Sequence, residues 1–426
     1  MSNKFSRFVR AAVVLSCVSM TFTAIPAADI TSTWTGATGL WTDPTQWTNN
    51  PPVADWPDNG RSGFTYDVVL NDPAHVTFFE TTATVDSLLA GGDLTIERSS
   101  LTVRRNLTLN NHTITLSDYF TSGNWLRLTG PQTLSGTGQI VSTTPFPRLG
   151  NNFLTCEGGD FTIAPGISVL NPASGGAVRA YTDSLRNQGA IITSSPDRNF
   201  TVWAPVLINE GLIESTNHSV LMLRADWTNT GTGAMNVNSI MLVDGNEIGR
   251  DLAFNKVLDE VKAARDHHWP AHGITSSAAH ADSRGMSALA VVLNDDGSGN
   301  PLYTLFAGGT IGIDANYTIV KYTWNGDANL DGVVNADDYF LIDSNYIPQN
   351  PGWQNGDFNY DAVINADDYF LIDSAFLGQT GPLSVDAPRP FTPIPDPATG
   401  GVLLLAVLAL GYHRKHRPPS RLTNPG

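Results

Sequence analysis

The chain is poor in cysteine, in charge and in long apolar runs. Its only cysteines are Cys17, in a predicted export signal, and Cys156, so the mature chain cannot form an intrachain disulfide. Charged residues make up 15%, with 24 Lys plus Arg against 40 Asp plus Glu. The net charge of −16 argues against nucleic acid as a partner. The apolar stretches near the two ends are each shorter than the roughly 20 residues that a stable membrane span needs.

Helical periodicity is absent before about residue 251, and short β-runs ended by Gly or Asn fill residues 65–243. Apolar and polar residues alternate in these runs, which predicts strands with one face buried. Asn/Gly corners recur at 134–140, 185–191, 207–213 and 228–233, in coils of about 20 to 25 residues. The sequence therefore predicts a mainly β fold, a right-handed parallel β-helix, with a β-sandwich or jelly roll as the alternative.

Four tryptophans, Trp34, Trp41, Trp47 and Trp56, lie close together near the N-terminus. They could form an aromatic platform for sugar rings, or a layer that caps the end of the β-domain. Their order is similar to the start of many exported bacterial β-solenoid surface proteins. Farther along, the spacing of apolar residues predicts a helix over 251–267, and 304–324 alternates like one or two closing strands.

Two aspartate-rich segments, 325–347 and 355–377, are identical at 16 of 23 positions. Each contains a loop with carboxylates and amides at positions 1, 3, 5, 9 and 12, here called loop 1 (327–338) and loop 2 (357–368). This order wraps oxygen atoms around a hard divalent cation such as calcium. The predicted ligands are Asp327, Asn329, Asp331, the Val333 carbonyl, Asn335 and Asp338 in loop 1, and Asp357, Asn359, Asp361, the Val363 carbonyl, Asn365 and Asp368 in loop 2.

The charge of this region supports a cation. Residues 325–377 contain ten Asp and no Lys, Arg or Glu, so the carboxylates would repel one another in a compact fold unless a metal compensated them. An acidic, solvated run is the alternative. At position 6, Gly332 permits a sharp turn, whereas Ala362 would adopt it at a cost of about 1 kcal/mol.

A helix is predicted after each loop, with Asn335 and Asn365 as N-caps, but none before it. A loop–helix unit used twice resembles the type I dockerin family over about 55 residues. The resemblance implies two calcium ions and a protein partner of the cohesin type, or another surface-layer protein. In that family, positions 10 and 11 contribute to recognition; here they are Ala336 with Asp337 and Ala366 with Asp367.

Both ends of the chain carry targeting patterns. Lys4, Arg7 and Arg10 precede an apolar stretch and small residues at 24–28, which predicts an export signal, with a lipoprotein signal through Cys17 as the alternative. At the other end, a Pro-Asp-Pro segment, a short apolar run and a basic cluster resemble the PEP-CTERM sorting signal. This resemblance implies processing by an exosortase-type enzyme and a transient or stable membrane anchor; a plain anchor helix is the alternative.

An enzyme is the second functional hypothesis, because β-helices and dockerins both accompany polysaccharide hydrolases and lyases. Such chemistry needs paired carboxylates or a carboxylate–calcium cluster. The predicted β-domain has sparse acids without an Asp-Asp pair: Glu157, Asp160, Asp183, Asp197, Glu210, Glu214 and Asp226. A zinc site from Asp266, His267, His268, His272 and His280 would match no common spacing. No catalytic residue is therefore assigned.

The sequence thus divides into a signal peptide (1–28), a Trp-rich cap (29–64), a β-solenoid (65–250), a helix with closing strands (251–324), a dockerin-like calcium module (325–380), a Pro-rich linker (381–395) and a PEP-CTERM-like segment (396–417). Together with the resemblance to exported planctomycete-type surface proteins, these parts predict a non-catalytic, calcium-binding protein at the cell surface or outside the cell. It would attach to a protein partner or to extracellular matrix, including polysaccharide.

Overall fold

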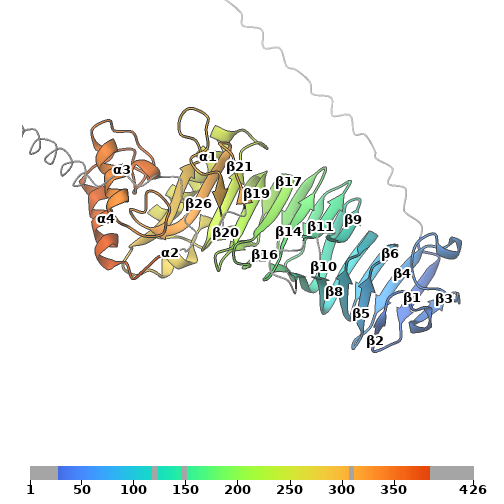
Figure 1. Ribbon diagram of the computed structural model, residues 1–426. Helices are drawn as coiled ribbons and strands as arrows, with labels where there is room; N and C mark the ends of the chain where they lie inside the picture. Colours follow the sequence, from blue (N-terminus) through green and yellow to red (C-terminus); the bar gives the residue numbers. More distant parts are fainter. Residues whose placement is uncertain (1–26, 118–122, 145–150, 307–310, 384–426) are drawn as a thin grey trace, which may run out of the picture.

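The computed structural model describes residues 27–117, 123–144, 151–306 and 311–383. It is mainly β, with 46% strand and 16% helix, as the sequence predicts. The strands stack into an elongated body, with the first strands at one end and the helices at the other (Figure 1).

The strands have the following bounds, in chain order. They are β1 (Ile30–Trp34), β2 (Thr38–Leu40), β3 (Trp47–Asn50), β4 (Tyr66–Leu70), β5 (His75–Phe79), β6 (Thr82–Ala90), β7 (Asp93–Glu97), β8 (Ser100–Ser117), β9 (Asn124–Thr129), β10 (Gln132–Thr143), β11 (Asn151–Glu157), β12 (Phe161–Ile163), β13 (Ile167–Asn171), β14 (Gly175–Ala180), β15 (Ser184–Asn187), β16 (Ala190–Thr193), β17 (Asn199–Asn209), β18 (Leu212–Ser215), β19 (Val220–Asn229), β20 (Ala234–Val237), β21 (Ile240–Asp244), β22 (Gly273–Thr275), β23 (Ser287–Leu293), β24 (Leu305–Phe306), β25 (Ile311–Gly312) and β26 (Tyr317–Trp324).

The helices are fewer and lie mostly toward the C-terminus. The α-helices are α1 (Arg250–Asp266), α2 (Ser277–Ala281), α3 (Ala336–Tyr346) and α4 (Ala366–Gly378), and short 3-10 helices are η1 (Pro44–Gln46), η2 (Arg61–Gly63) and η3 (Trp353–Asn355).

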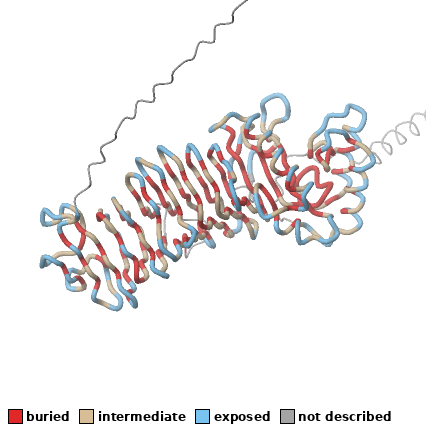
Figure 2. Tube along the Cα trace, turned by 180° about the vertical axis from the view of Figure 1, so that it is seen from behind, coloured by how far each residue is buried: buried red, intermediate tan, exposed pale blue. Residues whose placement is uncertain are grey.

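Successive passes of the chain lie on one another as parallel strands. One column runs through β6, β8, β10, β13, β16, β18, β20 and β22, and a second through β9, β11, β14, β17, β19 and β21. Apolar residues in register fill the interior, which Figure 2 shows as buried positions inside the body. One such row contains Ile114, Ile140, Val169, Ile191, Ile213, Met235 and Ile274, each at most 1% exposed.

The predicted fold class, a right-handed parallel β-helix or alternatively a β-sandwich or jelly roll, is wrong. Eight parallel strands close into a barrel, with pairings that run β8, β9, β11, β14, β17, β15, β12, β10 and back to β8. Closure depends on long strands that have different partners along their length. In β17, residues 200–203 pair with β14, whereas residues 206–209 pair with β15. Alternation along a sequence predicts a strand but does not identify its partners.

Buried asparagines connect neighbouring passes through their side chains. The Asn187 amide donates to Asn209 and the Asn209 amide donates to Asn229, each at 2.9 Å. Asn187 and Asn209 are fully buried, so these bonds satisfy polar groups that would otherwise be costly inside the body. The Asn229 amide in turn donates to Glu260 of α1 at 2.7 Å, which ties the ladder to the C-terminal end.

The tryptophans close the N-terminal end of the body. Trp34, Trp41 and Trp47 are buried, and Trp47 packs edge-to-face against both other rings at centroid distances of 5.0 Å. Trp56 is half-buried and carries the guanidinium of Arg61 at 3.9 Å from its ring centroid. Three buried rings leave no face for a sugar, which favours the capping interpretation over the aromatic platform.

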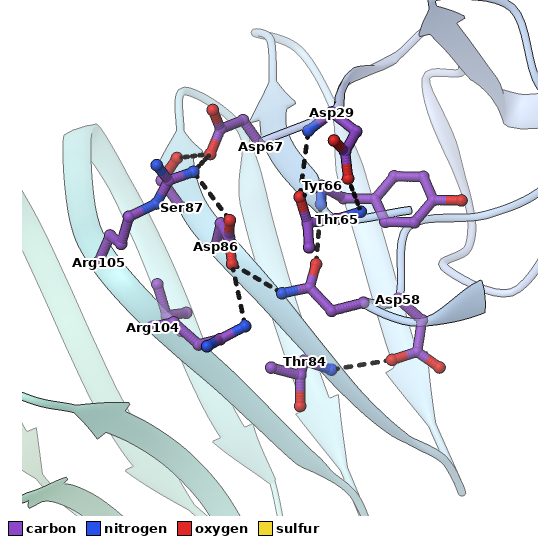
Figure 3. A network of polar contacts seen from close by, with 12 residues as sticks. Asp29, Asp58, Thr65, Tyr66, Asp67, Thr84, Asp86, Ser87, Arg104 and Arg105 are labelled. Atoms are coloured by element: carbon purple, nitrogen blue, oxygen red, sulfur yellow. Dashed lines mark hydrogen bonds and ion pairs between the residues drawn. The ribbon is translucent and has the colours of Figure 1, made fainter. Parts of the chain in front are cut away.

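Ion pairs join the first passes of the body (Figure 3). The Arg105 guanidinium contacts Asp86 at 2.9 Å and Asp67 at 3.1 Å, and so connects β8 with β6 and β4. Arg104 also approaches Asp86, at 3.6 Å. The nearly buried Asp86 thus has two cationic neighbours, and the arginines at this end of the body are matched by carboxylates.

Antiparallel strands and a helix terminate the parallel stack. The predicted helix is confirmed as α1, whose buried side is made by Ala253, Val257, Val261 and Ala264. The predicted closing strands are present, and β26 runs antiparallel to both β21 and β23. It leads directly into loop 1, so the aspartate-rich region begins at the end of the body.

Candidate metal centre

Loop 1 folds around its own carboxylates. Asp327 accepts hydrogen bonds from the backbone N–H groups of Asp331 at 2.9 Å and Gly332 at 2.8 Å. Asp338 reaches back across the loop and accepts from the N–H of Ala328 at 2.9 Å. The first and last predicted ligands are therefore both turned toward the backbone of the loop.

Loop 2 repeats these contacts. Asp357 accepts from the N–H of Ala362 at 3.2 Å, and Asp368 accepts from the N–H of Phe358 at 2.8 Å. At position 3 of each loop, the asparagine accepts from the N–H of position 5 at 2.9 Å and donates to the carboxylate of that residue, in the pairs Asn329–Asp331 and Asn359–Asp361. The sequence repeat is thus also a repeat of structure.

Position 9 caps the following helix. Asn335 accepts from the N–H of Asp337 at 2.8 Å, and Asn365 accepts from the N–H of Asp367 at 2.7 Å. Capping boxes with position 12 complete the starts of α3 and α4, which confirms the predicted N-caps and the helix after each loop. At position 7, the N–H groups of Val333 and Val363 donate to the position 5 carboxylates at 2.9 and 2.8 Å.

One carboxylate oxygen in loop 2 is buried without a hydrogen-bond donor. Asp357 is 4% exposed, and its Oδ1 has no partner in the part of the chain that the structure describes. An unpaired buried carboxylate oxygen is costly, and a hard divalent cation would satisfy it. The carboxylate, amide and carbonyl oxygens of the two loops fit such a cation. Among the described residues, no three His, Cys, Asp or Glu side chains are grouped to hold a metal by themselves.

Burial makes the first and last carboxyl groups of each loop hard to ionise. It raises the pKa of Asp338 to about 8, with a further contribution from the charge of Asp327. It raises the pKa of Asp327 to about 6, although the ammonium of Lys321 acts in the opposite direction. Burial likewise raises the pKa of Asp357 and Asp368 above their usual range. Acids crowded in this way are stabilised in their charged form by a nearby cation.

The sharp turn at position 6 has the predicted backbone conformation in both loops. Gly332 has φ +87° and Ala362 has φ +68°, so an alanine occupies the left-handed region that favours glycine.

Replacing Ala362 with glycine is therefore expected to raise the free energy of unfolding by up to about 1 kcal/mol, because it relieves the strained φ. Denaturant unfolding of the full chain measures this. Ala366→Gly, four residues later at the first position of α4, is the matched control and is expected to lower stability instead. A lower stability of Ala362→Gly than of the wild type would show that the positive φ of Ala362 is not strained.

Side chains of the body hold the backbone of loop 1. Lys321, on β26, is fully buried and its ammonium donates to the carbonyl of Leu330. The Tyr303 hydroxyl donates to the carbonyl of Asn329 at 3.0 Å. Sequence reasoning missed both residues. The available signal was a single basic residue within the apolar strand that precedes an acidic loop.

Loop 2 is also fixed to the body. The buried Tyr360 hydroxyl donates to the carbonyl of Leu289 and accepts from the N–H of Val291, both at 2.8 Å and both on β23. Between the loops, the Trp353 indole donates to the carbonyl of Asp327 at 2.7 Å. The two loops, η3 and the antiparallel strands therefore pack as a continuous unit.

The other candidate groups have structural contacts. The His280 Nδ1 lies 2.8 Å from the carbonyl of His268, and the histidine cluster forms no metal-holding group among the described residues. Several acids of the body bind side chains of adjacent passes: Asp160 with Ser184, Glu210 with Arg186, and Glu214 with Asn236. Asp226 binds Lys256 of α1. Cys156 is a buried free thiol whose pKa burial raises to about 12.

The predicted export signal and the PEP-CTERM-like segment lie outside the described residues. Within the ranges that the structure covers, no helix is long and apolar enough to cross a membrane. No family model, curated protein or solved structure matches the chain.

Proposed function

We propose that this chain is an exported, non-catalytic surface protein that binds two calcium ions through loops 1 and 2. The Oδ1 of Asp357 is buried in a loop lined by carboxylate and amide oxygens and has no hydrogen-bond partner among the described residues, and this observation carries the proposal. Calcium takes six to eight such oxygens in flexible geometry, which a loop of this composition can supply. Loop 1 has the same order of predicted ligands, although there both oxygens of Asp327 accept hydrogen bonds.

The helices that follow the loops would bind the partner. Phe340 of α3 and Phe370 of α4 occupy equivalent positions in the repeat and are 48% and 69% exposed. Leu377, near the end of α4, is 83% exposed. Apolar side chains that remain in water on two related helices favour a protein partner, cohesin-like or a surface-layer protein, that would cover them.

Location follows from the two chain ends. The N-terminal pattern would export the chain, and the PEP-CTERM-like segment would retain it at the membrane until an exosortase-type enzyme processes it. The elongated body would then hold the calcium loops away from its first strands, because the loops and these strands lie at opposite ends of the molecule (Figure 1).

Calcium titration calorimetry on the full chain tests the proposal. The wild-type protein is expected to bind two calcium ions; Asp327→Asn should remove one site and Asp357→Asn the other, because each loses the position 1 carboxylate. Asp183→Asn, an exposed acid of the body, changes the net charge equally and is the control. Absence of calcium binding by the wild type, or equal loss in the control, would refute the metal centre.

A further inference from the structure

Six side chains on one face of the body form what is here called the arginine–aromatic stripe. Its members are Trp125, Arg127, Phe153, Arg179, Trp203 and Arg224, on strands β9, β11, β14, β17 and β19. These strands follow one another along the body (Figure 1). In register, Phe153 lies beside Trp125, and Trp203 lies between Arg179 and Arg224.

The stripe faces outward because side chains alternate along a strand. On β9, Leu126 and Leu128 are fully buried, whereas Trp125 and Arg127 are partly exposed. The same alternation continues on the later strands, where Val178 and Val202 point inward and their neighbours in the stripe do not. The stripe is therefore accessible along its length.

Guanidinium groups lie against the rings. Arg127 is 4.7 Å from the ring centroid of Trp125, and Arg179 is 4.6 Å from that of Phe153 and 5.6 Å from that of Trp203. Trp125 and Phe153 stack at 4.2 Å. Packing on aromatic rings orders an arginine side chain without neutralising its charge. The Nε atoms of Arg127 and Arg179 are buried, so an anion would meet the outer Nη groups. Of these, Arg179 Nη1 also lies 3.5 Å from the Tyr181 hydroxyl.

Two of these charges have no carboxylate partner among the residues that the structure describes. Among the described residues, Arg127 and Arg179 form no ion pair, and their Nε groups donate no hydrogen bond. The arginines of the N-terminal passes are instead matched by Asp67 and Asp86 (Figure 3). Among the residues that the structure covers, carboxylates contact an arginine of the stripe at its far end, where Asp244 lies 2.9 Å and Glu247 3.8 Å from the Nε of Arg224. Uncompensated cations in a chain of net charge −16 point to an anionic ligand.

The spacing of the charges favours a linear polymer. Arg127, Arg179 and Arg224 lie on alternate strands of one parallel sheet, so successive guanidinium groups are offset by roughly 9 to 10 Å along the body. That offset is comparable with the length of a disaccharide unit. A chain of acidic sugars lying along the body would meet Arg127 and Arg179 with a carboxylate each, and guanidinium binds carboxylate in a bidentate, directional way.

We propose that the arginine–aromatic stripe binds an acidic polysaccharide, a chain of uronic acid units lying along the body. Carboxylates pair with Arg127 and Arg179, and the apolar faces of the sugars contact the exposed ring edges. A nucleic acid duplex is disfavoured because its phosphates follow one another every roughly 3.4 Å along each strand, much closer together than the arginines of the stripe. This surface is distinct from the calcium loops and does not depend on them.

Titration of the full chain with an oligogalacturonate, at one fixed calcium concentration, tests the stripe. The probe must be too short to gel with calcium. The wild type is expected to bind it, and Arg179→Gln to bind at least about tenfold more weakly, because one charge-assisted hydrogen-bonded pair is lost. A neutral oligosaccharide of equal length is expected not to bind.

Arg186→Gln is the matched control, since Arg186 lies on β15 and already pairs with Glu210. Circular dichroism and the melting temperature show that each variant is folded. Three results would overturn the proposal: no binding by the wild type, equal affinity of Arg179→Gln, or equal weakening by Arg186→Gln. A single-stranded oligonucleotide that binds with the same affinity as the oligogalacturonate, and that also needs Arg179, would show a general polyanion surface. That result would overturn the choice of polysaccharide.

Discussion

Replacing Glu260 with alanine is expected to lower the free energy of unfolding by at least about 3 kcal/mol. This carboxylate, on α1, accepts hydrogen bonds from the Trp227 indole at 2.9 Å, the Asn229 amide at 2.7 Å and the Ile274 N–H at 3.2 Å. Removing it leaves three donors without this acceptor. Two of them, the Trp227 indole and the Ile274 N–H, belong to fully buried residues, and each buried unsatisfied donor costs about 1–3 kcal/mol. It also frees the last member of the asparagine ladder.

Denaturant unfolding of Glu260→Ala beside Asp259→Ala measures this effect. Asp259 is the neighbouring exposed acid of α1, so the control removes the same charge from the same helix without removing these contacts. Its expected change is within about 0.5 kcal/mol. A Glu260 variant as stable as the control would show that the ladder does not depend on its terminal carboxylate.

Replacing Lys321 with methionine is expected to lower the free energy of unfolding by about 3–5 kcal/mol in the absence of calcium. Lys321 is fully buried, and its charge favours the ionised form of the buried Asp327. Methionine fills a similar volume but removes the ammonium, so Asp327 loses its cationic neighbour and Leu330 loses the donor to its carbonyl. A bound divalent cation would compensate the same carboxylate.

Calcium should therefore restore much of the stability lost in Lys321→Met. Unfolding curves are measured with chelator and with saturating calcium, for this variant and for Lys262→Met on α1. The comparison separates the contribution of the Lys321 ammonium to stability from that of the calcium ion. The Lys262 variant is expected to change little in either condition, because that side chain is half-exposed. An equal loss with and without calcium would show that Lys321 and the cation do not act on the same carboxylate.

The aspartate-rich region could be predicted because its determinants are local. The spacing of Asp, Asn and Gly within a dozen residues specifies the turn and the helix start. Asn335 and Asn365 cap helices as expected, and Gly332 and Ala362 adopt the positive φ that position 6 requires. None of these features depends on a distant partner.

The closed arrangement of parallel strands could not be predicted in the same way. It depends on where a long strand changes partner, as β17 does between Trp203 and Val206, where its register shifts. Pro205 lies at that shift and is a local sign of irregular pairing. The proline does not indicate which strands pair with β17 before and after the shift.

The buried charges were missed for a related reason. Glu260 belongs to a helix whose polar residues would be assigned to solvent, and its partner Asn229 lies 31 residues earlier. Lys321 is nine residues from Leu330, yet only the antiparallel pairing of β26 turns its side chain to loop 1. The hydrogen-bond partners of Glu260 and Lys321 are brought to them by the tertiary structure, so the local sequence does not reveal these contacts.

The antiparallel strands at both ends of the body also limit how molecules can associate. Within the described residues, β3 pairs antiparallel with β1 at the first end, and β26 pairs antiparallel with β21 at the last. A further molecule that continued the stack would need a free parallel edge, and such edges are the usual templates for aggregation. Among the described residues near the start, the edge strands β2 and β3 have three and four residues. Such short edge strands are poor templates for end-to-end fibre growth, so we expect the length of the body to be determined by the chain itself.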